Sequence, residues 1–155
     1  MGDFELRDAR SGDEPAIRHV VNTVLAEFGF NADPSGEDSD LDDIARSYLE
    51  PGGAFRVLVS ASGEIVGCAG LRPIASGAGE LRKMYILPVA RGRGWGRQLL
   101  LELLAHARRN GLRQLELETH SKLGTARALY RSLGFVEITR DDLSDRCDLA
   151  MEVQL

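Results

Sequence analysis

The chain has 155 residues, of which 43% are hydrophobic and 28% charged, and such values are typical of one globular domain. They exclude a wholly disordered, collagen-like or disulfide-dense chain. No apolar run approaches the roughly 18 residues of a membrane span, and the first residues lack the basic-then-apolar order of a secretory signal. We therefore expect a soluble, cytoplasmic protein in which residues 1–155 form a single domain.

The net charge of −5 is unevenly distributed along the chain. Residues 1–50 carry 13 acidic and 4 basic side chains, whereas residues 80–113 carry 8 basic and 2 acidic ones. A basic block inside an acidic protein suggests a local anionic ligand. It does not suggest a nucleic-acid partner, because nucleic-acid-binding domains are usually basic overall. The alternative is that these arginines form a solvated helix face.

Hydrophobic periodicity and turn residues predict the elements of the first half of the chain. In chain order they are a strand over 4–7, a helix from a cap at Ser11 or Asp13 to Phe28, a polar loop over 31–40, a short helix over 41–48, and strands over 55–59 and 64–71. The last two strands are separated by Ser62 and Gly63, which predicts a hairpin.

The second half of the chain reads as alternating strands and helices. The predicted elements are strands over 80–87, 114–119, 135–139 and 146–155, and helices over 94–110 and 125–133. The first of these helices has one apolar stripe formed by Trp95, Leu99, Leu100, Leu103, Leu104 and Ala107. Strands joined by helices and strands joined by hairpins coexist, so we expect a mixed sheet.

A glycine-rich turn precedes that helix and is the strongest chemical signal in the sequence. It consists of Arg91, Gly92, Arg93, Gly94, Trp95, Gly96 and Arg97. Glycines let a backbone turn sharply with its N–H groups exposed, and the first N–H groups of a helix lack intrahelical partners and lie at the positive end of its dipole. The turn therefore predicts a phosphate-binding site, to which the three arginines would add charge-assisted hydrogen bonds.

Two widespread phosphate-binding motifs do not fit this turn. A P-loop requires GxxxxGKS or GxxxxGKT, which the sequence lacks. The dinucleotide fingerprint requires GxGxxG, but Arg97 stands where its third glycine belongs. Glu116 and Glu118 do follow at about the 20-residue distance of a ribose-binding acid. However, the turn follows a hairpin and not a leading strand–helix–strand unit.

The sequence around the turn resembles the GNAT superfamily of N-acetyltransferases. Residues 91–96, RGRGWG, match that family's RGxGxG/A signature for acetyl-coenzyme A, and residues 80–88 resemble its fourth strand. Residues 126–135, ARALYRSLGF, resemble its later AxxLYxxxGF motif. The resemblance covers essentially the whole chain. It implies an α/β (α+β) fold with a central mixed, mostly antiparallel sheet of six to seven strands flanked by about four helices.

By this resemblance the chain is an enzyme that transfers the acetyl group of acetyl-CoA directly to an amine. The diphosphate would bind the backbone N–H groups between Arg91 and Arg97, and the pantetheine arm would pair with the strand at Met84, Tyr85 and Ile86. In this family that strand carries a bulge, where a free N–H stabilises the oxyanion of the reaction. Preorganised donors of this kind contribute about 3–4 kcal/mol.

The sequence departs from the family at Leu123. Many members have an asparagine there that contacts the cofactor. Ser121 or Lys122 would then supply that contact.

The resemblance and the chemistry together suggest two catalytic side chains. The attacking amine must be neutral, so a base or a water chain has to accept its proton, and Glu80 at the head of its strand is the first candidate. Tyr130 matches the family's tyrosine and would donate a proton to the leaving thiolate. The alternatives are an exposed strand-end carboxylate for Glu80 and a core tyrosine for Tyr130. His120 is more simply explained as a satisfied or solvated histidine.

The cysteines and histidines predict neither a metal site nor a covalent intermediate. Cys68 and Cys147 are far apart in the sequence, with no Cys/His cluster at metal-ligand spacing. No His/Asp partner is apparent that would activate Cys68 as a nucleophile. Both cysteines are therefore predicted to be small buried hydrophobes.

The sequence leaves the acceptor open. In the resembled family the first two helices flank the acceptor cleft, and here the loop between them is acidic, with Glu37, Asp38, Asp40, Asp42 and Asp43. This loop either attracts a cationic amine or is simply solvated. Arg72, Arg146 and Asp148 are further candidates that spacing alone does not place. The acceptor would be an amine of a small molecule or peptide, and pairing into a homodimer is left open. The competing hypothesis is a non-catalytic regulatory module that binds acetyl-CoA or a nucleotide.

Overall fold

The computed structural model describes residues 3–155, which form one seven-stranded sheet of order β1-β2-β3-β4-β5-β7-β6. The strands are β1 (Phe4–Asp8), β2 (Ala54–Ser60), β3 (Ile65–Ala75), β4 (Ala78–Ile86), β5 (Gln114–Thr119), β6 (Val136–Ile138) and β7 (Leu149–Gln154). All neighbouring strands are antiparallel except β4 and β5, which are parallel. The mixed, mostly antiparallel sheet predicted from the sequence is confirmed.

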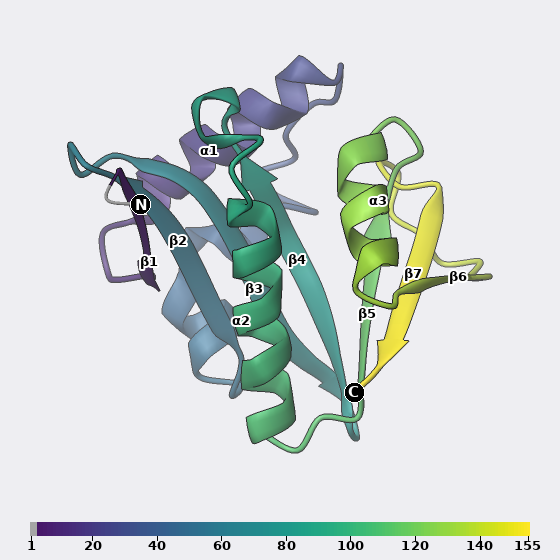
Figure 1. Ribbon diagram of the computed structural model, residues 1–155. Helices are drawn as coiled ribbons and strands as arrows, with labels where there is room; N and C mark the ends of the chain where they lie inside the picture. The colour runs from purple at the N-terminus through teal and green to yellow at the C-terminus, as the bar shows by residue number, and fades with distance from the viewer. Residues whose placement is uncertain (1–2) are drawn as a thin grey trace.

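Helices cover both faces of the sheet (Figure 1). Helix α1 (Glu14–Glu27) lies on one face, and α2 (Trp95–Arg109) and α3 (Gly124–Ser132) lie on the other. Three short helical turns complete the set: η1 (Ser39–Asp42), η2 (Ala45–Leu49) and η3 (Pro88–Ala90). Within residues 3–155, no helix is both long enough and apolar enough to cross a membrane.

Most element boundaries lie within two residues of those predicted, but β3 continues to Ala75 and β7 begins only at Leu149. Two other details also differ. The short helix predicted over 41–48 is two separate turns, η1 and η2, of which η1 has 3-10 geometry. Asp13 does occupy the position before α1, but its carboxylate does not cap the helix. It instead accepts two hydrogen bonds from Arg7, at 2.7 and 3.2 Å. The predicted cap is replaced by an ion pair that ties β1 to the start of α1.

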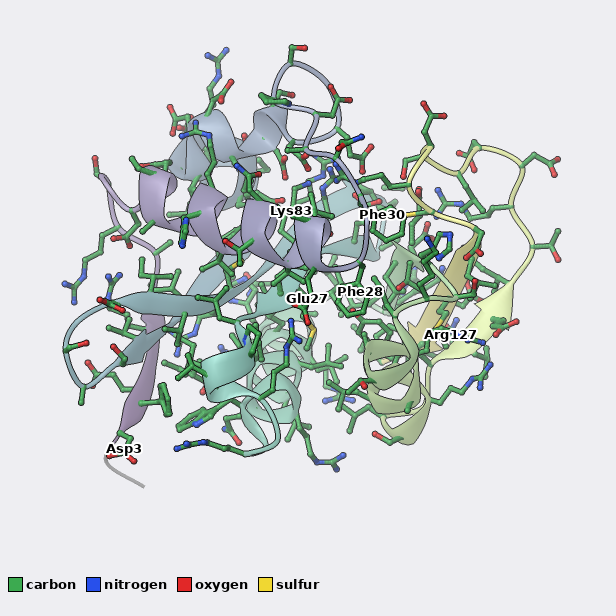
Figure 2. The ribbon with its side chains drawn as sticks, turned by 90° about the horizontal axis from the view of Figure 1, so that it is seen from above. Asp3, Glu27, Phe28, Phe30, Lys83 and Arg127 are labelled. Atoms are coloured by element: carbon green, nitrogen blue, oxygen red, sulfur yellow. The ribbon has the colours of Figure 1, made fainter. Side chains whose placement is uncertain are left out.

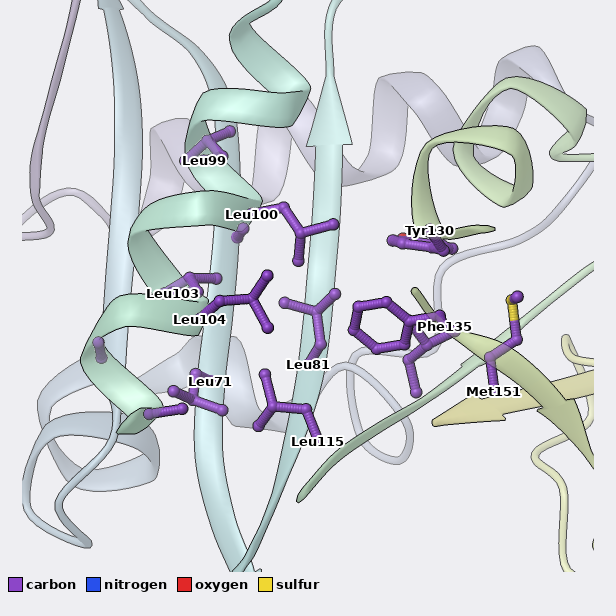
Figure 3. Packing of buried hydrophobic residues seen from close by; sticks show 14 residues of the cluster. Leu71, Leu81, Leu99, Leu100, Leu103, Leu104, Leu115, Tyr130, Phe135 and Met151 are labelled. Carbon is purple, nitrogen blue, oxygen red and sulfur yellow. The ribbon is translucent and has the colours of Figure 1, made fainter. Parts of the chain in front are cut away.

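The predicted apolar stripe of α2, except Trp95, packs on the sheet and forms the core of that face (Figure 3). Trp95 packs against a separate small cluster instead. The four leucines of the stripe, Leu99, Leu100, Leu103 and Leu104, are almost completely buried. They contact residues from β3, β4 and β5, and Phe135 and Met151 extend the same cluster under α3. Burying one such leucine contributes about 1.5–3 kcal/mol, so this face firmly fixes α2 and the turn that precedes it.

The sheet is split between its two central strands. Strands β4 and β5 pair only at Ala78–Glu80 with Gln114–Glu116. Beyond Glu80 they diverge towards the top of Figure 1. From Leu81 to Ile86 the edge of β4 that faces β5 therefore has no strand partner. Its backbone groups are available to a ligand, except the Ile86 carbonyl, which accepts a hydrogen bond from Arg91 Nε at 2.8 Å.

Candidate functional site

Two adjoining cavities lie along the opening between β4 and β5. The larger one, which we call the outer groove, has a volume of about 460 Å³. Its walls come from α1, the end of β4, the glycine-rich turn and the start of α3: Val24, Phe28, Met84, Tyr85, Ile86, Ala90, Arg91, Gly92, Gly94, Trp95, Gly96, Arg97, Lys122, Leu123, Gly124, Thr125, Ala126 and Leu129. Every residue assigned to the cofactor from the sequence lines it except Arg93.

The glycine-rich turn presents a row of backbone N–H groups at one end of the outer groove. Gly92 and Gly94 have φ angles of 75° and 84°, and a Cβ at either position would meet no atom within 4 Å. Gly94 precedes α2, and its carbonyl accepts the first helical bond, from the Gln98 N–H at 3.1 Å. The N–H groups of the first helical turn therefore lack helical partners. The turn has the shape and polarity of an anion site.

The three arginines of the turn are not equivalent. The Arg91 guanidinium binds both carboxylate oxygens of Glu27 at 2.6 and 2.7 Å, and its Nε donates to the Ile86 carbonyl at 2.8 Å. Arg91 therefore braces the turn against α1. Arg93 lies over the Phe4 ring at 5.3 Å. Among residues 3–155, the Arg97 guanidinium has a single long contact, to the Ser132 hydroxyl at 3.5 Å, so it is held least tightly of the three.

The smaller cavity, which we call the inner cavity, has a volume of about 90 Å³ and lies deeper between the strands. It shares Met84, Tyr85, Leu123 and Ala126 with the outer groove, so the two cavities adjoin at these residues. Both catalytic candidates from the sequence line this cavity. Its walls comprise Leu25, Phe30, Glu37, Glu80, Leu81, Arg82, Lys83, Met84, Tyr85, Leu117, Glu118, Thr119, His120, Leu123, Ala126, Tyr130, Arg146 and Cys147.

Glu80 is buried at the edge of the inner cavity, with 12% of its side chain exposed. Its Oε1 lies 3.4 Å from Arg72 Nε and 3.3 Å from an Arg82 nitrogen. The other oxygen, Oε2, has no hydrogen-bond partner among residues 3–155. The carboxylate is thus oriented through one oxygen, and the second oxygen is free to accept a proton or a hydrogen bond.

Tyr130 faces the inner cavity from α3 and is 5% exposed. Its ring packs against Phe135 with centroids 5.7 Å apart, whereas its hydroxyl has no hydrogen-bond partner in the described part of the chain. Burial raises the pKa of Tyr130 well above that of a free phenol. The hydroxyl is therefore protonated at every physiological pH and is available as a donor.

His120 closes the inner cavity but is not free to act as a base. Its Nδ1 accepts a hydrogen bond from the Lys122 backbone N–H at 3.0 Å, and its Nε2 lies 3.5 Å from an Asp148 oxygen. Its ring also packs edge-on against Phe30, with centroids 5.0 Å apart. Because Nδ1 accepts, the neutral ring carries its proton on Nε2. The structure shows the satisfied histidine that was predicted.

A buried charged cluster beside the inner cavity was not predicted from the sequence. Lys83 Nζ lies 3.2 Å from oxygens of both Asp38 and Asp40. Arg146 binds both oxygens of Asp38, at 2.7 Å each, and Arg82 Nε lies 3.4 Å from Asp40. The cluster joins three distant segments: the loop after α1, strand β4 and the loop before β7. Figure 2 looks down on this region, with Lys83 and Phe30 labelled.

This cluster corrects both sequence interpretations for Asp38 and Asp40, whereas Asp42 and Asp43 are exposed, as a solvated loop predicts. Asp38 and Asp40 are 4% and 8% exposed and paired with cations, so they are neither solvated nor an unscreened field for a cationic amine. Asp42 pairs with Arg18 at 2.9 Å. Asp38 and Asp40 therefore neutralise basic residues that the loop covers.

Replacing Arg146 with methionine is expected to lower the free energy of unfolding by about 2 kcal/mol at pH 7. Burial alone would raise the pKa of Asp38, but the hydrogen bonds from Arg146 and the Asp33 N–H, with the nearby Lys83 charge, lower it from 3.8 to about 2. A lowered pKa stabilises the folded state above the unfolded-state value, and this stabilisation is lost as the pH falls through the folded-state value.

The stability difference between wild type and Arg146→Met should therefore be constant above about pH 5 and shrink towards pH 2. Urea unfolding across this range measures it. The control is Arg18→Met, which breaks an exposed pair and should cost less than about 1 kcal/mol. A difference for Arg146→Met that did not change between pH 5 and pH 2 would contradict the assignment to the Asp38 pair.

The comparisons with known proteins agree with this geometry. Residues 19–135 match the family described as Acetyltransferase (GNAT) family. The uncharacterized N-acetyltransferase YjgM of Escherichia coli strain K12 is 40% identical over 131 residues, which are 81% of this chain and 78% of that protein.

Two solved structures show the same fold. A GNAT-family acetyltransferase from Staphylococcus aureus Mu50 superposes with a TM-score of 0.91 at 23% identity, covering 97% of this chain and 98% of its own. A phosphinothricin acetyltransferase from Sinorhizobium meliloti, solved in complex with acetyl-CoA, superposes with a TM-score of 0.79 at 23% identity. That superposition covers 100% of this chain and 89% of the other. At these identities the two structures bear on the fold alone.

Proposed function

The chain belongs to the GNAT family of acetyltransferases, and from this premise we propose that it transfers the acetyl group of acetyl-CoA directly to a primary amine of a small molecule or peptide. One observation carries the proposal. The anion-binding turn and the end of β4 line the outer groove, Glu80 and Tyr130 line the inner cavity, and the two cavities share four wall residues. We treat residues 1–155 as one domain with this activity.

The outer groove fits acetyl-CoA at both of its chemically distinct parts. The diphosphate would accept hydrogen bonds from the N–H groups between Gly92 and Arg97, where the positive φ angles and open space of the glycines admit it. Arg97 would add a cation at its side. The pantetheine amides would pair with the unpaired edge of β4 at Met84, Tyr85 and Ile86, as an added strand does.

The protein's part in the chemistry is to orient two reactants and move two protons. Acetyl-CoA supplies a thioester, whose carbonyl carbon the amine attacks. Glu80 would accept the amine's proton on Oε2, because Arg72 and Arg82 hold its other oxygen. Tyr130 would donate its proton to the departing thiolate, because its raised pKa keeps it protonated where the amine is neutral. The unpaired N–H groups of β4 would stabilise the developing oxyanion.

The inner cavity limits the shape of the acceptor. At about 90 Å³ this cavity is much smaller than the outer groove of about 460 Å³, which favours a slender group over a bulky ring system. Phe30, Tyr85 and Tyr130 supply aromatic walls, while the cations Arg146 and Lys83 are already paired with carboxylates. We infer that a primary amine on an unbranched chain enters this cavity and that the rest of the acceptor stays outside.

The experiment that tests the proposed function is thiol release from acetyl-CoA in the presence of a panel of amines. The panel should contain short alkylamines, amino acids, peptides with free N-termini and aminoglycosides. We expect turnover with slender primary amines, measured as free CoA together with the acetylated amine by mass spectrometry. Binding of acetyl-CoA without thiol release for any amine would contradict the proposal and favour a non-catalytic binding module.

A further inference from the structure

Strand β4 carries a bulge at Lys83, where the two cavities meet. In its register with β3, Tyr85 pairs with Cys68 and Arg82 pairs with Gly70, so Lys83 and Met84 together face the single residue Ala69. Lys83 has a φ of 55°, and no other non-glycine residue of the described chain has a positive φ. Residues with a Cβ adopt this conformation rarely, so something must hold it here.

Contacts hold the bulge from both sides. The Lys83 side chain is 3% exposed, and its ammonium contacts Asp38, Asp40 and the Glu37 carbonyl, each at 3.2 Å. On the side of β3, the Cys68 thiol donates a hydrogen bond to the Lys83 carbonyl at 3.1 Å. Burial raises the pKa of Cys68 to about 12, so the thiol is protonated and remains a donor.

The bulge lies where the acetyl group would be held. Lys83, Met84 and Tyr85 line the inner cavity, and the last two also line the outer groove. A residue in the left-handed region turns the peptide groups beside it away from the directions they have in a regular strand. The orientation of these N–H groups towards the opening therefore depends on the conformation of Lys83.

We propose that Lys83 is a positioning residue, whose ammonium, through Asp38 and Asp40, fixes the β4 bulge so that its backbone N–H groups face the acetyl carbonyl. The same contacts hold the loop after α1 over the inner cavity. One side chain therefore positions both the part of the site that would hold the acetyl group and the part that would hold the amine. This inference rests on the proposed function for the place of the acetyl group.

The test is Lys83→Met, which keeps the chain length and removes the charge. The variant should fold, because Asp38 keeps Arg146, and Asp40 keeps Arg82 and a hydrogen bond from Tyr48. The primary measurement needs no amine substrate. It is the carbon-13 chemical shift of bound acetyl-CoA labelled at its acetyl carbonyl carbon, which reports hydrogen bonds to the carbonyl oxygen. In Lys83→Met it should move back towards the position of free acetyl-CoA.

Two further measurements separate positioning from general damage. The affinity for CoA, which lacks the acetyl group, should stay within about twofold of the wild-type value by calorimetry. The kcat should fall about 100-fold, which is near the smallest decrease found when an oxyanion donor is removed. The matched control is Arg7→Met, which breaks the ion pair to Asp13 far from the cavities. It should alter neither the resonance nor kcat by more than about twofold.

A second variant, Lys83→Gly, keeps the inference testable if the methionine variant unfolds. Glycine adopts a φ of 55° readily, so the backbone retains access to the bulge while the anchor is lost, and the same changes are expected. An unchanged resonance and kcat in a folded variant would overturn the proposal, as would a parallel loss of CoA affinity. Unfolding of both variants would also overturn it and assign Lys83 to stability.

Failure of the proposed function would look different. The wild-type protein would bind acetyl-CoA with a shifted carbonyl resonance, but it would transfer no acetyl group to any amine.

Discussion

Replacing Gly94 with glutamate is expected to weaken acetyl-CoA binding by at least about 1000-fold, or about 4 kcal/mol. The new side chain would enter the open space in front of the first turn of α2, where we propose that the diphosphate binds. Its carboxylate would occupy the N–H groups and repel the phosphates, and charge-assisted hydrogen bonds contribute about 1.5–3 kcal/mol each. Calorimetric titration with acetyl-CoA measures the loss, and NAD serves as the comparison ligand.

The matched control is Gly111→Glu, which introduces the same side chain just beyond the other end of the same helix. Gly111 has a φ of 77° and, like Gly94, open space around its Cβ position. Both variants therefore bear similar backbone strain, about 1–2 kcal/mol, but only Gly94 lines the outer groove. Gly111→Glu should bind acetyl-CoA as wild type does. Unchanged affinity in a folded Gly94→Glu protein would refute the placement of the diphosphate.

The second large effect is expected for Tyr130→Phe, which should lower kcat about 100-fold while leaving the affinity for acetyl-CoA within about threefold. The substitution removes only the hydroxyl and retains the ring that packs on Phe135. Since the hydroxyl has no hydrogen-bond partner within residues 3–155, its loss leaves no buried group unpaired and stability should hold. Steady-state kinetics with the best amine of the panel, with thermal melting as a check on folding, measure the effect.

A comparison with Tyr85→Phe distinguishes a specific acid from a general loss of polarity in the inner cavity. Tyr85 lines the same cavity, and burial likewise raises the pKa of its hydroxyl. The loss of kcat in Tyr85→Phe should be about tenfold smaller than in Tyr130→Phe. Equal losses in the two variants, or an undiminished kcat in Tyr130→Phe, would remove the acid role from Tyr130.

The parts of the site that are local in sequence were predictable. The glycine-rich turn and the helix after it were identified because their signals lie within one continuous segment. These signals are the glycines of the turn, the apolar stripe of the helix and Gly111, which follows the end of the helix. The strand over 114–119 has the predicted boundaries, and its Leu115 and Leu117 are buried as the alternation indicated. Local propensity and periodicity decide such features.

The charged cluster was not predictable in the same way. Asp38, Lys83 and Arg146 lie far apart in the sequence, and only the folded sheet brings them together. Composition suggested a solvated acidic loop because most charge runs are solvated. Pairing with buried cations is a tertiary effect that no local pattern records.

The sequence did not mark the position of the bulge. Arg82 and Lys83 are consecutive polar residues, but Met84, Tyr85 and Ile86 are consecutive apolar ones, so the strand has no regular alternation that an inserted residue would break. The resemblance implied a bulge somewhere in this strand, but not its position or its anchor. The position depends on the register with β3, and the anchor depends on the loop after α1.

The split between β4 and β5 makes the sheet two half-sheets that share a seam of only three register pairs, Ala78–Glu80 with Gln114–Glu116. Above the seam, contacts across the gap run between loops, such as Asp38 with Arg146 and Phe30 with His120. A bound donor whose amides pair with β4 would fill the place of the missing strand pairing. The substrate would then act as a temporary structural element that joins the two half-sheets. Each release of product would leave the opening between β4 and β5 unfilled again.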